Sequence, residues 1–127
     1  MRAVDTNTLV RLLARDDAEQ TASADAFVAD GAWVSHLVLM EAMWVLAAVY
    51  ELPAAKIATA IEMLLNHRSL SIQDADVVAA ALGHFRKRPS LGFSDGLILG
   101  VARKAGHLPL GTFDRKLVSL DGAQRLA

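Results

Sequence analysis

The sequence contains no cysteine, and this absence excludes several kinds of chemistry. Disulfide bonds, catalysis by a thiolate and zinc sites built on cysteine are all ruled out. Histidine is sparse too, and the four residues are widely separated, with no local metal-ligand spacing: His36, His67, His84 and His107. Any metal site in this protein is therefore expected to consist of oxygen ligands.

Long apolar runs are missing as well. No stretch of about 18 or more residues is both apolar and uncharged, so no membrane-spanning helix is expected. The first residues, MRAVDTNT, lack the apolar core of a signal peptide, and a cytoplasmic protein is expected. The hydrophobic fraction of 54% is ample for one core in a chain of 127 residues. We therefore expect a single domain over residues 1–127.

A strong net charge is also absent, because the chain has 13 basic and 14 acidic residues. If four of the acids lie in a metal site, the bases exceed the remaining 10 acids by three. Three short basic clusters stand out: Arg86-Lys87-Arg88, Arg103-Lys104 and Arg115-Lys116. Such clusters are typical of solvated helix ends, and they are also compatible with contacts to nucleic acid.

Segments typical of strands and helices alternate along the chain. Strands are expected at residues 2–4, 32–35, 70–72 and 108–112, and helices from about residue 8, at 18–29, at 36–50, after Pro53, at 74–87 and at 93–105. The tail, VSLDGAQRLA, leaves a last edge strand open. This alternation predicts an α/β fold with a parallel sheet covered by helices on both faces.

Four carboxylates occupy positions that suit a common site. Asp5 directly follows the first expected strand, and Asp114 follows the fourth. Asp95 opens the helix before that fourth strand, and Glu41 is the only charged residue between His36 and Glu51. Ligands of open parallel sheets collect at the carboxyl ends of the strands, where these aspartates are expected.

Each carboxylate also has a simpler interpretation. Asp5, Asp95 and Asp114 lie where an aspartate can cap a helix or occupy its first turn, and Glu41 can lie on an exposed stripe. Their convergence at one edge would be repulsive unless a divalent cation held them. Oxygen ligands without imidazole or thiolate favour Mg²⁺ or Mn²⁺.

The segments AVDTNTLVRLLARDD, WVSHLVLMEAMWVL and FSDGLILGVARKAGHLPLGTFDRKL resemble PIN-domain ribonucleases, and most of all the VapC toxins of bacterial toxin–antitoxin pairs. The resemblance spans nearly the whole chain and implies a three-layer α/β/α sandwich around a parallel sheet. It implies that Asp5, Glu41, Asp95 and Asp114 form the catalytic metal site. It also implies polar neighbours that orient a carboxylate, a water or a phosphate: Thr6, Asn7, Ser94 and Thr112.

A Mg²⁺- or Mn²⁺-dependent endoribonuclease is therefore expected, in which water attacks and leaves a 5′-phosphate and a 3′-hydroxyl. Glu41 is either a metal ligand or a base that holds the attacking water. Single-stranded or loop RNA is the expected substrate, with backbone contacts from residues near the motifs: Arg11, Arg15, Arg115 and Lys116. Phe93 and Phe113 are expected to anchor the two aspartate motifs in the core.

The resemblance also implies protein partners. One is a small antitoxin that covers the acidic site. A second copy of this chain is another, through the helix that carries Met40, Met43, Trp44, Val45 and Tyr50, which is apolar around most of its circumference. Two alternatives stay open: a PIN-like module that binds RNA or a partner without cutting, and an aspartate-based phosphatase, although that class typically has a second acid where this chain has Asn7.

Overall fold

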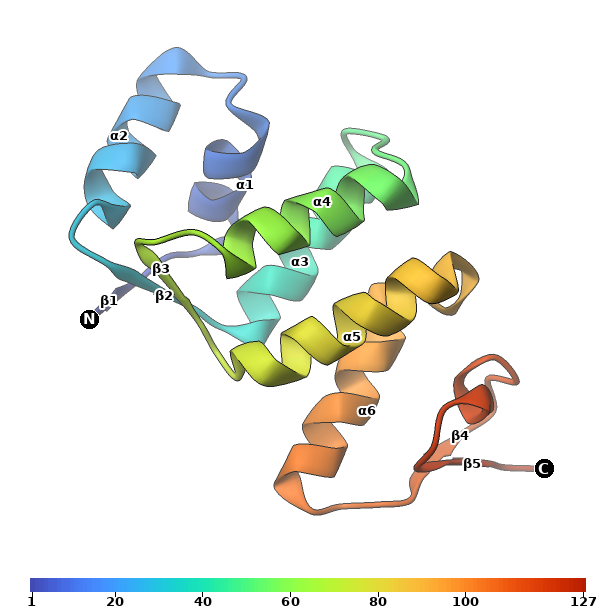
Figure 1. Cartoon of the computed structure of the whole chain (residues 1–127). Helices are drawn as coiled ribbons and strands as arrows, with labels where there is room; N and C mark the ends of the chain where they lie inside the picture. The colour runs from blue at the N-terminus through green and yellow to red at the C-terminus, as the bar shows by residue number, and fades with distance from the viewer. The chain divides into compact units, whose positions relative to one another are not determined.

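A computed structural model describes residues 1–127, which form two units, Met1–Ala75 and Asp76–Ala127 (Figure 1). The first unit contains β1 (Arg2–Ala3), α1 (Thr6–Ala14), α2 (Ala18–Val28), β2 (Ala32–Val34), α3 (His36–Ala48), α4 (Ala54–Leu65) and β3 (Leu70–Ile72). The second contains α5 (Ala75–Lys87), the 3-10 turn η1 (Pro89–Leu91), α6 (Phe93–Ala105), β4 (Leu110–Thr112), η2 (Leu117–Ser119) and β5 (Ala123–Arg125).

A three-stranded sheet organises the first unit, with the strand order β1-β2-β3 and parallel pairing throughout. The register places Arg2 opposite Ala32, and Trp33 opposite Ser71. Because the strands run in parallel, the segments that follow β1 and β2 leave the sheet at the same edge. Asp5, which follows β1, therefore lies at the edge of the sheet where the sequence predicts the site.

Short polar side chains start three of the four helices of the first unit, α1, α2 and α3. Asp5, Asp17 and Ser35 each lie just before a helix and accept a hydrogen bond from the backbone N–H three residues later. These bonds satisfy one of the N–H groups that a helix start leaves without a partner. At the other end of α1, Arg15 has a left-handed backbone, with φ of 53°, and so ends the helix.

The core of the first unit lies where α1 packs against α2 and α3, and α3 packs against α4. Leu9, Leu39, Leu46 and Ile61 are fully buried. Burial of one such side chain contributes roughly 1.5–3 kcal/mol, so this apolar layer is the main force that holds the helices against one another. It fixes α1, which starts directly after Asp5, and α3, which carries Glu41 near its middle.

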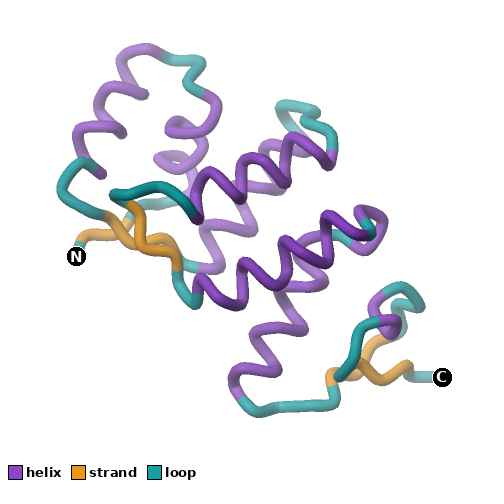
Figure 2. Tube along the Cα trace, in the orientation of Figure 1, coloured by secondary structure: helices purple, strands orange, loops and turns teal.

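The second unit is built on the crossing of α5 and α6 and on a two-stranded parallel sheet of β4 and β5. Helix α6 contacts α5 through its glycines, and Phe85 meets Phe93 edge to face. A small cluster of Leu91, Leu99 and Leu117 lies beside the sheet. Figure 2 shows how short the strands are beside the helices, so helix packing supplies most of the buried surface.

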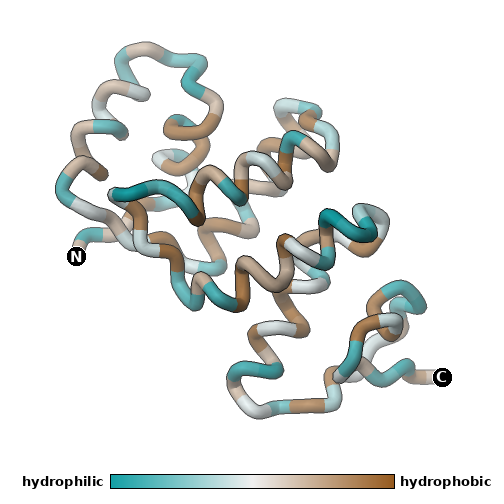
Figure 3. The backbone as a smooth tube through the Cα atoms, viewed as in Figure 1, coloured by the Kyte–Doolittle hydropathy of each residue, from teal (hydrophilic) through white to brown (hydrophobic).

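The structure confirms the four predicted strands and the six predicted helices, with β4 starting at Leu110. It adds β5, which the sequence left open. Arg86 and Lys87 lie in the last turn of α5, and Arg103 and Lys104 lie in the last turn of α6. Hydrophilic residues mark the end of α5 in Figure 3. None of the helices has the length and hydropathy needed to cross a membrane.

The prediction that two phenylalanines anchor the aspartate motifs in the core is wrong for one of them. Phe93 is buried as expected, with 6% of its surface exposed, but Phe113 is 72% exposed. The turn after β4 explains the difference. The Asp114 N–H donates to Thr112 Oγ1, and Asp114 Oδ1 accepts from the Lys116 N–H, so local bonds hold this loop without help from the aromatic ring.

Candidate active site

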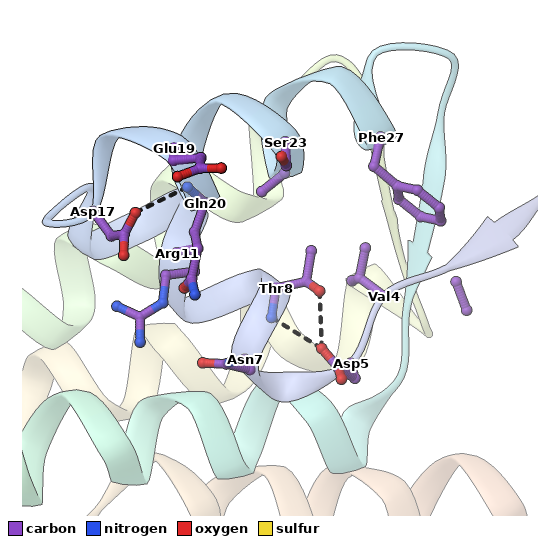
Figure 4. Close-up of a pocket in the computed structure, with 12 residues that line it drawn as sticks. Val4, Asp5, Asn7, Thr8, Arg11, Asp17, Glu19, Gln20, Ser23 and Phe27 are labelled. Carbon is purple, nitrogen blue, oxygen red and sulfur yellow. Dashed lines mark hydrogen bonds between the residues drawn. The ribbon is translucent and has the colours of Figure 1, made fainter.

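Asp5 lies between β1 and α1 and is exposed. Its Oδ1 atom accepts two hydrogen bonds from Thr8, one from the backbone N–H and one from the hydroxyl, each 2.9 Å long (Figure 4). These bonds lower the pKa of Asp5 because they stabilise the ionised carboxylate, and slight burial opposes them. Asp5 is therefore a fixed negative charge at neutral pH. It also caps α1, so the capping and the metal-site interpretations are compatible.

Thr8 is a residue of this site that the sequence reasoning did not single out. The sequence did contain a signal for this contact. Thr8 is three residues after Asp5, and at this spacing the backbone N–H of a residue in the first turn donates to a capping side chain. The second bond, from the hydroxyl, fixes the rotation of the Asp5 carboxylate.

Glu41 lies on α3 and is exposed, so the apolar segment around it does not bury its charge. It lines a pocket of about 460 Å³ together with Asp5, Thr6 and Asn7. The first unit therefore brings two of the four predicted carboxylates, with two of their predicted polar neighbours, to one cavity.

Arg11 lines the same pocket, and its guanidinium is held in a small network. Its Nη1 atom donates to Asp16 Oδ1 at 2.8 Å and to the Tyr50 hydroxyl at 3.3 Å, while that hydroxyl donates to Asp16 Oδ2 at 2.9 Å. The bond from Tyr50 and the bond from Arg11 both lower the pKa of Asp16. Sequence reasoning missed this network because Tyr50 is far from Arg11 and Asp16 in the chain.

Asp95 lies in the first turn of α6, in the second unit, and is half-buried. Burial raises its pKa, the nearby carboxylate of Asp114 raises it further, and Lys116 lowers it. The preceding Gly92 has φ of 84°, and a Cβ there would stand 3.3 Å from Asp95 Oδ2. Glycine therefore permits both the backbone turn and the close approach of the carboxylate.

Asp114 lies in the loop after β4, where Thr112 and Lys116 set its position. Its N–H donates to Thr112 Oγ1 at 3.0 Å, and its Oδ1 accepts from the Lys116 N–H at 2.8 Å. Thr112 thus holds the backbone of the loop that carries Asp114. Ser94 is exposed, one residue before Asp95.

The structure thus groups the predicted carboxylates in two pairs, Asp5 with Glu41 and Asp95 with Asp114. No group of three or more carboxylate or histidine side chains that could hold a metal is gathered in residues 1–127. The donors fit Mg²⁺ or Mn²⁺ in kind, since all are oxygens. The second pair fits a cation electrostatically as well, because two carboxylates that repel each other are stabilised by a divalent ion between them.

The predicted RNA-contacting residues differ in their surroundings. Arg15 makes two bonds to Asp25, at 2.8 and 3.1 Å, and Arg11 is engaged by Asp16, as described above. Arg115 is exposed, and Lys116 Nζ reaches the Ser90 carbonyl at 3.4 Å. The charges of Arg11 and Arg15 are therefore partly compensated, whereas the side chain of Arg115 is exposed.

Comparison with known protein families finds that the model of the PIN domain matches residues 2–123, which spans both units. The predicted α/β/α fold with a parallel sheet is confirmed by this match together with the six helices and parallel strands. Comparison with curated proteins and with solved structures finds no match.

Proposed function

This chain belongs to the PIN domain family, whose members are generally nucleases, and we propose that it is a Mg²⁺- or Mn²⁺-dependent endoribonuclease. The observation that carries this proposal is the pair formed by Asp95 and Asp114. A half-buried carboxylate beside a second one is destabilising by itself, as the raised pKa of Asp95 records. In sites that bind a divalent cation, the charge of the ion compensates the repulsion between such carboxylates.

We assign Asp5, Glu41, Asp95 and Asp114 to one catalytic centre of a single PIN domain. Asp5, Asp95 and Asp114 act as direct or water-mediated ligands of the metal. Thr8 holds the carboxylate of Asp5, and Thr112 holds the loop of Asp114. Asn7 and Thr6 are on the pocket of Asp5, and Ser94 is next to Asp95, so these side chains can orient a water or a phosphate.

When bound, the metal lowers the pKa of a coordinated water and neutralises charge on the departing oxygen. Glu41, which is exposed on the same pocket as Asp5, either binds the metal or accepts a proton from the attacking water. Because water attacks the phosphodiester, the ribose 2′-hydroxyl takes no part. The products are a 5′-phosphate and a 3′-hydroxyl.

The substrate that we propose is single-stranded or loop RNA, whose backbone can reach the carboxylates. Arg115 and Lys116 follow Asp114 directly and are exposed, and they are the better placed of the predicted backbone contacts because Arg11 and Arg15 are paired with Asp16 and Asp25. Arg11 and Arg15 contribute where RNA phosphate replaces their present acidic partners, Asp16 and Asp25.

The biological role that we propose is that of a VapC-type toxin, active in the cytoplasm and inhibited by a cognate antitoxin. An antitoxin that presents a basic side chain to Asp5 and Glu41 would compensate the charge of their pocket. We also propose a homodimer through α3. Trp44 on this helix is 66% exposed and Leu37 is 82% exposed, whereas Met43 is buried. The first two are large apolar side chains that a second copy could cover.

The test is the cleavage of a mixed single-stranded RNA pool in Mg²⁺, in Mn²⁺ and in EDTA, with analysis of the product ends. The proposal predicts cutting with either metal, none in EDTA, and 5′-phosphate ends. Asp30→Asn is the matched control for substitutions in the site, since Asp30 is an exposed aspartate in a turn outside it. A 2′,3′-cyclic phosphate product that persists in EDTA would contradict the mechanism.

A further inference from the structure

A second pocket lies between α1 and α2, next to the pocket of Glu41, and we name it the α1–α2 pocket (Figure 4). Its volume is about 750 Å³, within the range of sites that bind small organic groups. Asn7, Thr8 and Arg11 line it from α1, and Gln20, Ser23 and Phe27 line it from α2. Asp5 lines both pockets, so a group in the α1–α2 pocket lies beside the candidate metal ligand.

The polar groups of this pocket include several without an internal hydrogen bond. Thr8 donates to Asp5, and Asp17 Oδ1 accepts from the Gln20 N–H, so these two side chains are used within the fold. The side-chain amides of Asn7 and Gln20 have no hydrogen-bond partner in the structure. Each amide offers both a donor and an acceptor, which is the pattern that reads the edge of a nucleobase.

The charges of the pocket favour a base over a phosphate. Three carboxylates line it, from Asp5, Asp17 and Glu19, against the single cation of Arg11. The Nη1 atom of Arg11 is already shared between Asp16 and Tyr50. A phosphate would be repelled by the carboxylates, whereas an N–H donor of a base would be attracted to them.

Phe27 supplies the aromatic contact that base recognition commonly uses. It is half-buried at the end of the pocket away from Asp17. The guanidinium of Arg2 lies over its ring, 3.9 Å from the centroid, and Arg2 Nη2 also donates to the Phe27 carbonyl. These contacts fix the ring. Aromatic side chains and arginine planes are the usual stacking partners of unpaired RNA bases.

We infer that the α1–α2 pocket binds one unpaired nucleobase of the RNA next to the cleaved phosphodiester, and that it favours bases with an exocyclic amino group over uracil. The inference rests on the proposed ribonuclease activity for its place in the reaction. Adenine, cytosine and guanine carry an amino group that donates to a carboxylate or an amide oxygen. Uracil has no amino group, and its one ring donor, N3–H, lies between two carbonyl oxygens, so a carboxylate that accepts from N3–H also faces these two oxygens.

The first experiment is independent of cleavage. Free nucleosides are titrated into the protein in EDTA, and the side-chain amide signals are followed by NMR. Because a nucleoside has no phosphate, its binding reports on this pocket and not on the metal site. Adenosine and cytidine are expected to shift the NMR signals of the Asn7 and Gln20 side-chain amides, and uridine is expected to shift them much less. Gln20→Leu should abolish the shifts of Asn7, whereas Gln124→Leu, at an exposed glutamine on β5, should leave them unchanged.

The second experiment uses RNA substrates that differ only in the nucleotides beside the cut. Gln20→Leu and Ser23→Ala are expected to reduce the preference among bases by on the order of tenfold while leaving metal dependence intact. Unchanged melting temperatures of both variants establish that they are folded.

The two proposals fail in different ways. Nucleoside binding without any RNA cleavage would support the pocket and overturn the nuclease. Cleavage with an unchanged base preference in Gln20→Leu, and no nucleoside shifts, would overturn the pocket and leave the nuclease standing. Binding of a peptide to these residues, without binding of nucleosides, would also overturn the base pocket.

Discussion

Gly96 and Gly100 lie one turn apart on α6, and the structure predicts opposite effects when each is replaced by alanine. A Cβ at Gly96 would lie 3.6 Å from the Ala81 Cα and Cβ atoms, which is ordinary van der Waals contact. A Cβ at Gly100 would lie 2.8 Å from Val77 Cγ1, closer than atoms can pack. Both glycines are in the same helix and face α5, so each serves as the control for the other.

The magnitudes follow from helix propensity and packing. Alanine is more favourable than glycine inside a helix by roughly 0.5–1 kcal/mol, and the contact with Ala81 adds to this gain. Gly96→Ala should therefore raise the free energy of unfolding by about 1 kcal/mol, and the melting temperature by roughly 3–5 °C. At Gly100 the same gain is opposed by overpacking of about 1–3 kcal/mol, because the β-branched Val77 cannot easily rotate away. A net destabilisation is expected.

The assay is urea unfolding followed by far-UV circular dichroism, with the midpoint and the slope compared for the three proteins. RNA cleavage by Gly96→Ala should equal that of the wild type, since the added methyl group points to α5 and not to Asp95. Equal stabilisation by both substitutions would refute the described crossing of α5 and α6. A loss of more than about 1 kcal/mol in Gly96→Ala would refute the reasoning on propensity.

Three further predictions concern the site and its surface. Asp5→Ala should lower stability by about 1 kcal/mol because it removes the cap of α1, whereas Asp5→Asn keeps an acceptor for Thr8. Since folding lowers the pKa of Asp5, the stabilisation by its charge is present above the usual aspartate pKa of about 3.9 and is lost as the pH falls through the folded-state value. Thermal melts of Asp5→Asn and of the wild type, compared at pH values on both sides of this pKa, check the expectation. Burial, and next the nearby Asp114 carboxylate, raise the pKa of Asp95 on folding, so its ionised form destabilises the protein as the pH rises. Asp95→Asn should therefore raise the melting temperature in EDTA at neutral pH, with a smaller gain in acid. An equal gain at every pH would contradict this destabilisation by the ionised carboxylate. Trp44→Glu should shift the proposed dimer to monomer in light scattering at rising concentration, and a wild-type protein that is monomeric at high concentration would contradict the contact through α3.

Local chemistry explains why most of the helices were predictable. Asp5, Asp17 and Ser35 cap helices through hydrogen bonds to residues three positions later, and such short-range bonds can be predicted from the sequence. Gly106 has φ of 84° and ends α6, as a glycine after an apolar helix predicts. The strand β5 was harder to predict, because three residues with mixed polarity carry no periodic pattern.

The sequence selected the residues of the candidate site but not their geometry. Position after a strand made Asp5 and Asp114 candidates, and isolation in an apolar segment made Glu41 one. The apolar residues around Glu41 did not show whether it is buried, and α3, which packs against α1 and α4, places it at the surface. The link of Tyr50 to Arg11 and Asp16 depends on packing between distant segments, and no local pattern encodes it.

We propose that Asp5 and Asp95 serve one metal-dependent catalytic centre. The most direct measurement is a double-mutant cycle of RNA cleavage rates in Mg²⁺ for wild type, Asp5→Asn, Asp95→Asn and the double variant. Groups that act as a unit are strongly non-additive, so each single substitution should slow cleavage by about 100-fold or more and the double variant should be hardly slower than the worse single. Losses that multiply in the double variant, or a single variant that cuts at the wild-type rate, would contradict one shared centre.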